Sequence, residues 1–215
     1  MKGTTDLIPL KVSLVPVLKK IQAGKAEICL WKITEQIADF SVSTDDLESD
    51  HTTRNKQWMA SRAALEALDV DVSKLQKDDF GKPYLRGKGK HLSLSHCSKY
   101  AAGITGSLPV GIDIEEITPR IERIAQRFVH DKEWEFIKKS KRIETLYILW
   151  SAKEALYKLY GKKAVDFKNH MIARPFKTTK SGWFEMEFLK DTKAVFTIQY
   201  EIYDNHSLVW VEGEV

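Results

Sequence analysis

The stretch 143–160 constrains the fold of this 215-residue chain more than any other, because it has the pattern of one long helix among strand-like segments. Three leucines recur on one side of this helix and are predicted to face the core: Leu149, Leu156 and Leu159. Glu154 and Lys158 are four residues apart, so they share another face. Gly161 is the predicted C-terminal stop. The stretch therefore predicts a helix with one buried face and one charged face.

Strand-like stretches lie on both sides of this helix. They are rich in β-branched and aromatic residues, and they cover 25–33, 90–95, 100–106, 110–115, 171–176, 183–189, 194–203 and 207–211. The last three are spaced like an antiparallel meander. A further stretch, 7–18, is broken by Pro9 and Pro16, which favours an edge strand.

Helical and loop patterns occupy much of the remaining chain. Helical periodicity appears at 50–68, where four apolar residues are predicted to fall on one side: Trp58, Met59, Leu65 and Leu68. Pro119 suits the first turn of a helix that ends near residue 128, and a second short helix is predicted from Asp131. Residues 78–90 contain glycine and proline and are predicted to be a loop. Separate strands and helices of this kind predict the α+β class.

A pair of carboxylates follows a strand period upstream of the long helix. Asp113 and Glu115 are two residues apart, so they share one face of the predicted strand. With Glu154 they offer three hard oxygen donors, and Lys158 adds an ammonium group. Such a set suits a divalent metal ion and a phosphate-bearing substrate. The alternative is a solvated strand end beside an ordinary helix pair worth roughly 0.2–0.5 kcal/mol.

Ser95 and His96 form a second polar pair, at the end of a predicted strand. Histidine can bind or protonate a phosphate oxygen near neutral pH. A serine–histidine nucleophile is disfavoured, because adjacent strand residues point to opposite faces. The alternative for His96 is an ordinary surface histidine at a strand end.

Basic residues in two other segments are candidate phosphate contacts. Gly81 would let the backbone approach a ligand closely, and Pro83 stiffens the turn that carries Lys82. The alternative for this segment is a plain turn. Arg54 and Arg62 are eight residues apart, about two helical turns, so both can face one way. Arginine is well suited to bind phosphate, because its planar guanidinium can donate two hydrogen bonds at once. The alternative is that both arginines are ordinary solvated residues on the helix surface.

Four segments, in this order along the chain, resemble the signature blocks of the 4′-phosphopantetheinyl transferase superfamily in its long, surfactin-synthetase-activating type: FGKPY (80–84), SLSH (93–96), VGIDIE (110–115) and WSAKEALYK (150–158). Members of this type look like two fused copies of a smaller fold. The resemblance therefore implies an α+β protein of two similar halves with pseudo-twofold symmetry, each a small antiparallel sheet packed on a long helix. A faint repeat of 62–68 in 153–159 agrees with this. We place the boundary at 107–110, between an N-terminal half (1–108) and a C-terminal half (109–215) with the metal-binding motifs.

The resemblance also implies an activity, with its site in the cleft between the halves. Coenzyme A would be the donor, a serine of an apo acyl or peptidyl carrier protein the acceptor, and adenosine 3′,5′-bisphosphate the released product. Asp113, Glu115 and Glu154 would hold Mg²⁺ on the diphosphate. Glu154 would also take the serine proton, Lys158 would stabilise or protonate the leaving phosphate, and His96 would hold the diphosphate. Further coenzyme A contacts are expected from Gly81, Lys82, Pro83 and Ser95 and, on charge and spacing, from Arg54 and Arg62.

Composition limits the partners and the setting. The net charge of +4 favours acidic partners, such as an acidic apo carrier protein, but is too small to require nucleic acid. Cys29 and Cys97 lack metal-ligand spacing, and we expect them to stay reduced in a cytoplasmic setting. No apolar run is long enough to span a bilayer, so no membrane association is expected. Because one chain would carry both halves, we expect a monomer.

Two alternatives from other functional classes stay open at this point. A metal-dependent phosphodiesterase or nuclease would use the same carboxylates. A nuclease would also be expected to have a more strongly basic surface along which nucleic acid binds. A non-catalytic coenzyme A or carrier-protein binding module would keep the scaffold and bind without turnover. Incubation with coenzyme A, Mg²⁺ and an apo carrier protein separates the three.

Overall fold

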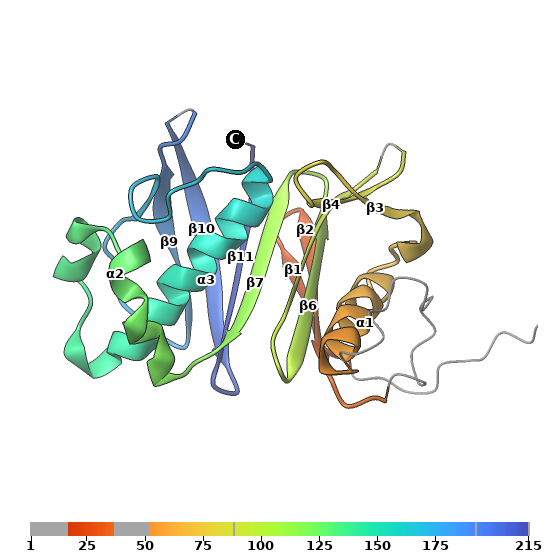
Figure 1. Cartoon of the computed structure of the whole chain (residues 1–215), viewed down its shortest axis with the longest axis horizontal. Helices are drawn as coiled ribbons and strands as arrows, with labels where there is room; N and C mark the ends of the chain where they lie inside the picture. Colours follow the sequence, from red (N-terminus) through yellow and green to blue (C-terminus); the bar gives the residue numbers. More distant parts are fainter. Residues whose placement is uncertain (1–16, 37–51, 88, 192, 215) are drawn as a thin grey trace, which may run out of the picture.

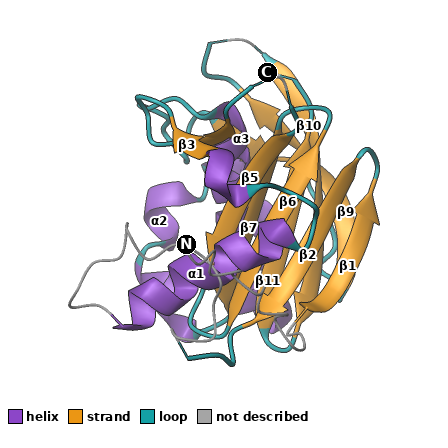
Figure 2. Ribbon diagram, turned by 90° about the vertical axis from the view of Figure 1, so that its right-hand side faces the viewer, coloured by secondary structure: helices purple, strands orange, loops and turns teal. Residues whose placement is uncertain are grey.

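The computed structural model describes residues 17–36, 52–87, 89–191 and 193–214. These residues form four layers (helix, sheet, sheet and helix), which follow one another from α3 to α1 in Figure 1. Figure 2, turned by 90°, shows α1 lying across the strands of its sheet. Every described strand pair is antiparallel. The predicted α+β class with antiparallel sheets is therefore confirmed.

The first sheet has the strand order β1-β2-β6-β5. Its strands are β1 (Val17–Ala23), β2 (Ala26–Lys32), β5 (His91–His96) and β6 (Tyr100–Gly106). One of its faces is covered by α1 (Thr52–Glu66) and the other by the second sheet. Between α1 and β5 lie the short helix η2 (Val72–Lys74) and a hairpin made of β3 (Leu75–Lys77) and β4 (Pro83–Leu85).

The second sheet has the order β7-β11-β10-β9-β8 and includes the predicted meander. Its strands are β7 (Val110–Glu116), β8 (Met171–Ala173), β9 (Ser181–Phe188), β10 (Ala194–Tyr203) and β11 (His206–Glu212). Its outer face carries α3 (Arg142–Tyr160). Short helices link β7 to α3: η3 (Pro119–Arg123), α2 (Ala125–Phe128), η4 (Asp131–Glu135) and η5 (Lys139–Lys141).

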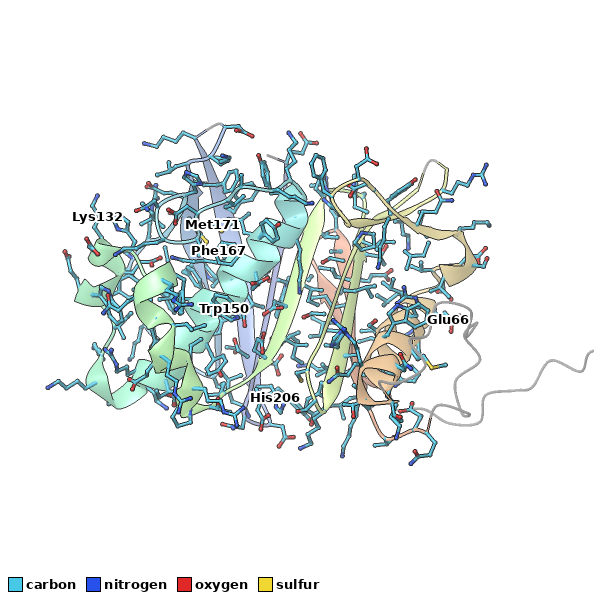
Figure 3. All side chains as sticks on the ribbon, in the orientation of Figure 1. Glu66, Lys132, Trp150, Phe167, Met171 and His206 are labelled. Carbon is cyan, nitrogen blue, oxygen red and sulfur yellow. The ribbon has the colours of Figure 1, made fainter. Side chains whose placement is uncertain are left out.

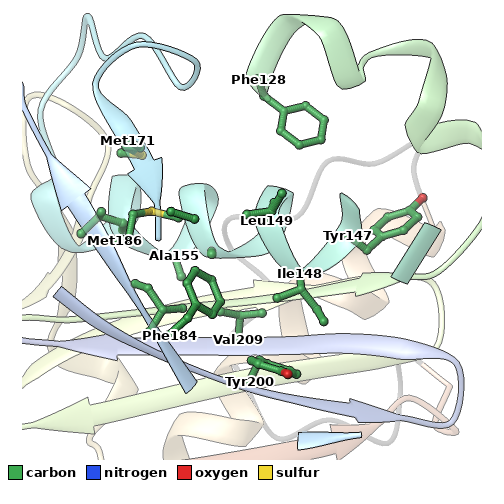
Figure 4. Close-up of a cluster of buried hydrophobic side chains, with 14 of the residues drawn as sticks. Phe128, Tyr147, Ile148, Leu149, Ala155, Met171, Phe184, Met186, Tyr200 and Val209 are labelled. Atoms are coloured by element: carbon green, nitrogen blue, oxygen red, sulfur yellow. The ribbon is translucent and has the colours of Figure 1, made fainter. Parts of the chain in front are cut away.

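Three apolar clusters fill the spaces between the four layers. Buried residues between α1 and the first sheet include Cys29, Ala64 and Leu65. Those between the two sheets include Ile28, Ile104, Ile112 and Leu208. Figure 4 shows the third cluster, in which Leu149 and Ala155 of α3 lie over Phe184 and Val209 of the second sheet. The three leucines predicted to face the core are all buried here: Leu149, Leu156 and Leu159.

Gly111 brings the backbone of β7 directly against α3. A Cβ atom at this position would lie 1.9 Å from the carbonyl oxygen of Ala155 and 3.0 Å from the amide nitrogen of Leu159. In the first sheet, Gly103 allows a similar but less close contact with α1, where a Cβ atom would lie 3.3 Å from the backbone of Ala64. Each long helix therefore meets its sheet at a glycine, and at Gly111 the contact has no room for a side chain.

Lys153 and Glu133 form an ion pair in which both side chains are fully buried. The ammonium of Lys153 donates to Glu133 Oε2 at 2.7 Å and to the carbonyl oxygen of Phe128 at 2.6 Å. Glu133 Oε1 accepts the N–H of Ala173 in β8 at 2.8 Å. Burial lowers the pKa of Lys153, and the charge of Glu133 opposes that shift. The pair ties the short-helix segment to α3 and β8, so this lysine of the 150–158 motif is a structural residue.

Two predictions differ from the structure. Residues 78–90 were expected to be loop throughout, but β4 lies within them, because Leu75 and Leu85 pack the β3–β4 hairpin against the α1 cluster. Trp58 was expected to share the buried side of α1 with Met59, but it is only half-buried. The apolar face of α1 is therefore narrower than the sequence suggests.

Other predictions are met in part or are not tested. Of the predicted strand 7–18, only its end is described, as the start of β1, and residues 50–51 of the predicted helix also lie outside the described residues. The turn 107–109 joins β6 to β7, while the domain boundary and the pseudo-twofold relation stay predictions. Cys29 and Cys97 are buried and free, as expected. Within the described part of the chain, no helix combines the length and apolar character needed to cross a membrane.

Candidate active site

A cavity of about 1030 Å³ lies where β5, β7, α1, α3 and the β3–β4 hairpin meet. Every residue that the sequence proposed for the site lines this cavity: Arg54, Arg62, Gly81, Lys82, Pro83, Ser95, His96, Asp113, Glu115, Glu154 and Lys158. They come from both sheets and both long helices. The structure thus brings the predicted residues together in one place, while their individual roles stay predictions.

The carboxylates reach the cavity because of the strand alternation at Asp113 and Glu115 and the helical spacing at Glu154. Ile112 and Ile114 of β7 point into the core between the sheets, so Gly111, Asp113 and Glu115 form the opposite face, toward α3. The close contact of Gly111 with α3 places that helix directly over this face.

Asp113 is the centre of the polar contacts in the cavity and is only 3% exposed. Its Oδ1 atom accepts hydrogen bonds from Lys158 Nζ at 2.8 Å and from Ser95 Oγ at 2.8 Å. Lys158 also donates to the carbonyl oxygen of Ile112 at 3.0 Å. Within the described residues the ion pair of Lys158 is with Asp113, so the alternative of an ordinary helix pair with Glu154 does not describe this site. Asp113 Oδ2 is buried and has no hydrogen-bond partner among the described residues.

The pKa values of the two other carboxylates, Glu115 and Glu154, are raised by burial and by the negative charge of Asp113. Burial and then the Asp113 carboxylate raise the pKa of Glu115 to about 7, while a hydrogen bond from Trp150 opposes the shift. The same two causes raise the pKa of Glu154, against the attraction of Lys158. Trp150 (Figure 3) is held by Phe167, with the ring centroids 5.7 Å apart. The three carboxylates therefore repel one another, and Lys158 offsets only part of that repulsion.

These donors fit a magnesium ion in chemistry but do not form a ready-made centre. In the described ranges, no group of three or more histidine, cysteine, aspartate or glutamate side chains is arranged to hold a metal ion. Magnesium takes hard oxygen ligands, keeps several waters and commonly binds through one or two carboxylates plus substrate phosphates. The unpartnered Oδ2 of Asp113 and the raised pKa of Glu115 are what such a cation would relieve.

The raised pKa of Glu115 predicts how stability depends on pH. A carboxyl whose folded pKa of about 7 exceeds its unfolded value favours the protonated folded state. Its contribution is complete below the unfolded pKa and is lost as pH rises through about 7, by at most about 1.4 kcal/mol per pH unit. We expect the free energy of unfolding of Glu115→Gln, measured with urea in the metal-free protein, to depend less on pH than that of the wild type. Glu116→Gln, at the exposed neighbouring position, is the matched control, and equal slopes in both variants would contradict the prediction.

His96 lies at the end of β5 and faces cationic neighbours. Burial, followed by the positive charges of Lys158 and Arg54, lowers the pKa of His96. A neutral imidazole at neutral pH can offer one ring N–H as a hydrogen-bond donor to a ligand in the cavity.

Lys82 has a partner at the end of α3. Its Nζ donates to the carbonyl oxygen of Leu159 at 2.5 Å, in the last turn of the helix, and burial lowers the pKa of Lys82. Asp78 shapes the turn beside it, since Asp78 Oδ1 accepts the amide hydrogens of Phe80 and Lys82. Gly81 adopts the left-handed region at φ 86°. The segment 81–83 thus joins the hairpin to α3 as well as lining the cavity, a connection that the sequence did not indicate.

Aromatic side chains complete the wall and were not predicted as site residues. The guanidinium of Arg62 lies 3.2 Å from the ring centroid of Trp58, one turn before it on α1. Tyr157 and Phe80 also line the cavity. The spacing of four between Trp58 and Arg62 is the sequence signal that indicates this stack.

The comparisons with known proteins agree with this geometry. A family model for the 4′-phosphopantetheinyl transferase superfamily matches residues 109–210. The 4′-phosphopantetheinyl transferase psf-1 of Bacillus pumilus is 38% identical over 100 residues, which are 45% of this chain and 43% of the relative. A 4′-phosphopantetheinyl transferase of Bacillus subtilis is 30% identical over 121 residues, 54% of each chain. The transferase Sfp of Bacillus subtilis strain 168 is 33% identical over 99 residues, 44% of each chain.

These matches span about half the length of the curated relatives. The matched range 109–210 contains β7 and α3, so the similarity to the 4′-phosphopantetheinyl transferase superfamily lies in this part of the chain.

Proposed function

We propose that this protein is a 4′-phosphopantetheinyl transferase, which transfers the 4′-phosphopantetheine arm of coenzyme A to a serine of an apo acyl or peptidyl carrier protein. The serine oxygen forms a bond to the phosphorus that bears the pantetheine, and the bond from that phosphorus to the bridging oxygen breaks. Adenosine 3′,5′-bisphosphate leaves. The observation that carries the proposal is the shared cavity, in which carboxylates, lysines, a histidine and arginines converge from both sheets and both long helices. Relatives named as 4′-phosphopantetheinyl transferases support it.

Charge neutralisation is the main task of such a site, because the reacting group is a diphosphate. Asp113, Glu115 and Glu154 would hold Mg²⁺, and the bound ion would supply positive charge to the diphosphate oxygens. Lys158 supplies a second positive charge from α3 and is already oriented by Asp113. Mg²⁺ dependence is part of the proposal.

Proton transfer from the acceptor serine falls to Glu154. Its raised pKa makes it a stronger base than an ordinary glutamate at neutral pH. Lys158 can neutralise or protonate the leaving phosphate, since its ammonium lies beside the same carboxylate cluster. His96 is proposed as a further contact of the diphosphate, and Lys82, Arg54 and Arg62 are proposed as further contacts of coenzyme A.

Assembly and setting follow from the same proposal. Strands and helices of one chain enclose the cavity, so we propose an active monomer of the long type. The net charge of +4 suits an acidic carrier protein. A cytoplasmic location is proposed from the two free cysteines.

Product analysis tests the proposed reaction against its alternatives. The chain is incubated with coenzyme A and Mg²⁺, with and without an apo carrier protein, and nucleotides are separated by chromatography. We expect adenosine 3′,5′-bisphosphate only when the carrier is present. Release without a carrier would instead indicate a phosphodiesterase, and binding of intact coenzyme A without any release would indicate a binding module.

His96→Ala is expected to weaken coenzyme A binding or slow transfer by roughly 10- to 100-fold, the size of a hydrogen bond to a charged group. Calorimetric titration with coenzyme A and a transfer assay measure the two effects. His91→Ala is a matched control, because His91 lies on the same strand at an exposed position and does not line the cavity. Equal affinity and rate in both variants would show that His96 is not part of the site.

A further inference from the structure

Two serines of β5 connect the first sheet to β7 of the second. Ser93 Oγ accepts the amide hydrogen of Ile112 at 3.3 Å, and Ser95 Oγ accepts that of Ile114 at 3.3 Å. Both serines are buried and alternate along the strand, so they face the same way. Hydroxyl groups therefore satisfy backbone donors of β7 where the sheets meet.

The two serines differ in one contact. Ser95 uses its hydroxyl hydrogen to donate to Asp113 Oδ1 at 2.8 Å. Among the described residues, the side-chain bond of Ser93 is the one to the backbone amide of Ile112 in β7. Ser95 is thus held at the Ile114 amide on one side and fixes a carboxylate on the other.

Asp113 Oδ1 is fully engaged as a result. It accepts from both Ser95 and Lys158, two donors that come from different elements, β5 and α3. Two such bonds fix the plane of the carboxylate as well as its position. Oδ2 is then the atom of Asp113 left for a ligand, and it is the one without a partner among the described residues.

We propose that Ser95 is a positioning residue, which orients Asp113 so that only Oδ2 is available to a hard divalent cation. This inference rests on the proposed function, because that function assigns the cation to Asp113. It also revises the expectation that Ser95 contacts coenzyme A. Hydrogen bonds that orient a ligating side chain typically contribute 10- to 100-fold to metal affinity.

The test compares Ser95→Ala with Ser93→Ala in the full chain. Mn²⁺ serves as the probe, because it prefers the same oxygen ligands as Mg²⁺, and its binding is followed by electron paramagnetic resonance without coenzyme A or carrier. We expect Ser95→Ala to weaken Mn²⁺ binding by about 10-fold or more and Ser93→Ala to leave it near that of the wild type. Both variants lose a bond between β5 and β7, and Ser95→Ala also loses the bond to Asp113, so its urea midpoint should fall at least as far as that of Ser93→Ala.

The outcomes separate this inference from the proposed function. Equal Mn²⁺ affinity in Ser95→Ala and the wild type, with binding lost in Asp113→Asn, would overturn the positioning role and leave the cation site intact. Equal weakening in both serine variants would also overturn it, since that pattern indicates a general effect of the sheet junction. A wild type that binds no Mn²⁺ would reject the cation site and the inference together, while the product analysis would still test the transfer reaction.

Discussion

Asp113→Asn is expected to lower pantetheine transfer by at least about 10²- to 10³-fold while the chain stays folded. Asparagine keeps the size of the side chain and can still accept hydrogen bonds from Ser95 and Lys158. It removes the negative charge that orients Lys158 and that would hold a cation through Oδ2. The transfer rate of this variant, measured beside its melting temperature, checks the prediction.

Folding should survive this change for a structural reason. Lys158 is 27% exposed at its side chain, so its ammonium can reach water when the ion pair is weakened. No apolar contact is removed, and we expect the melting temperature to change by less than about 5 °C. A variant that is folded and transfers at the wild-type rate would contradict the role of Asp113, whereas a variant that unfolds would show that the carboxylate is mainly structural.

Gly111→Ala is expected to destabilise the chain strongly, by about 3 kcal/mol or more, the upper end for overpacking a core. The added Cβ would lie 1.9 Å from the carbonyl oxygen of Ala155, so β7 and α3 must move apart. Because Asp113 and Lys158 stand on these two elements, activity should fall in whatever fraction stays folded. Urea unfolding and the transfer assay measure both effects.

Gly89→Ala is the control for this prediction. A Cβ atom there would have its closest neighbour at 3.9 Å, Leu85 Cδ1, which is an ordinary contact. Its effect should stay within about 0.5 kcal/mol, as for most surface substitutions. If Gly111→Ala is equally mild, the contact between β7 and α3 is looser than the structure indicates.

Periodicity predicted the elements that present the site. The helical spacing of the leucines at 149, 156 and 159 and the glycine stop gave α3, which spans Arg142–Tyr160 and ends at Gly161 in the left-handed conformation. The alternation at Asp113 and Glu115 predicted the face of β7 that turns toward the cavity. Helical and strand periodicity depend only on residues that are close in the sequence, so both can be recognised in a single sequence.

Contacts between distant segments could not be predicted in this way. The spacing of four left open an ordinary helix pair between Lys158 and Glu154, but the close approach of β7 to α3 brings Asp113 within reach of Lys158. Lys153, one residue from Glu154 in the same motif, turns to the opposite side and is buried against Glu133. Helical periodicity placed Trp58 on the apolar side of α1, yet it lines the cavity, with Arg62 stacked on its ring.

If this cavity moves the pantetheine arm onto a carrier protein, the intact mass of the carrier must increase. An apo carrier protein is incubated with the chain, coenzyme A and Mg²⁺, with Asp113→Asn in a parallel reaction, and is then weighed by mass spectrometry. We expect the wild type to add the mass of one phosphopantetheine arm per carrier and the variant to leave the carrier unmodified over the same time. A carrier whose mass stays unchanged with the wild type, across acyl and peptidyl carrier proteins, would contradict it.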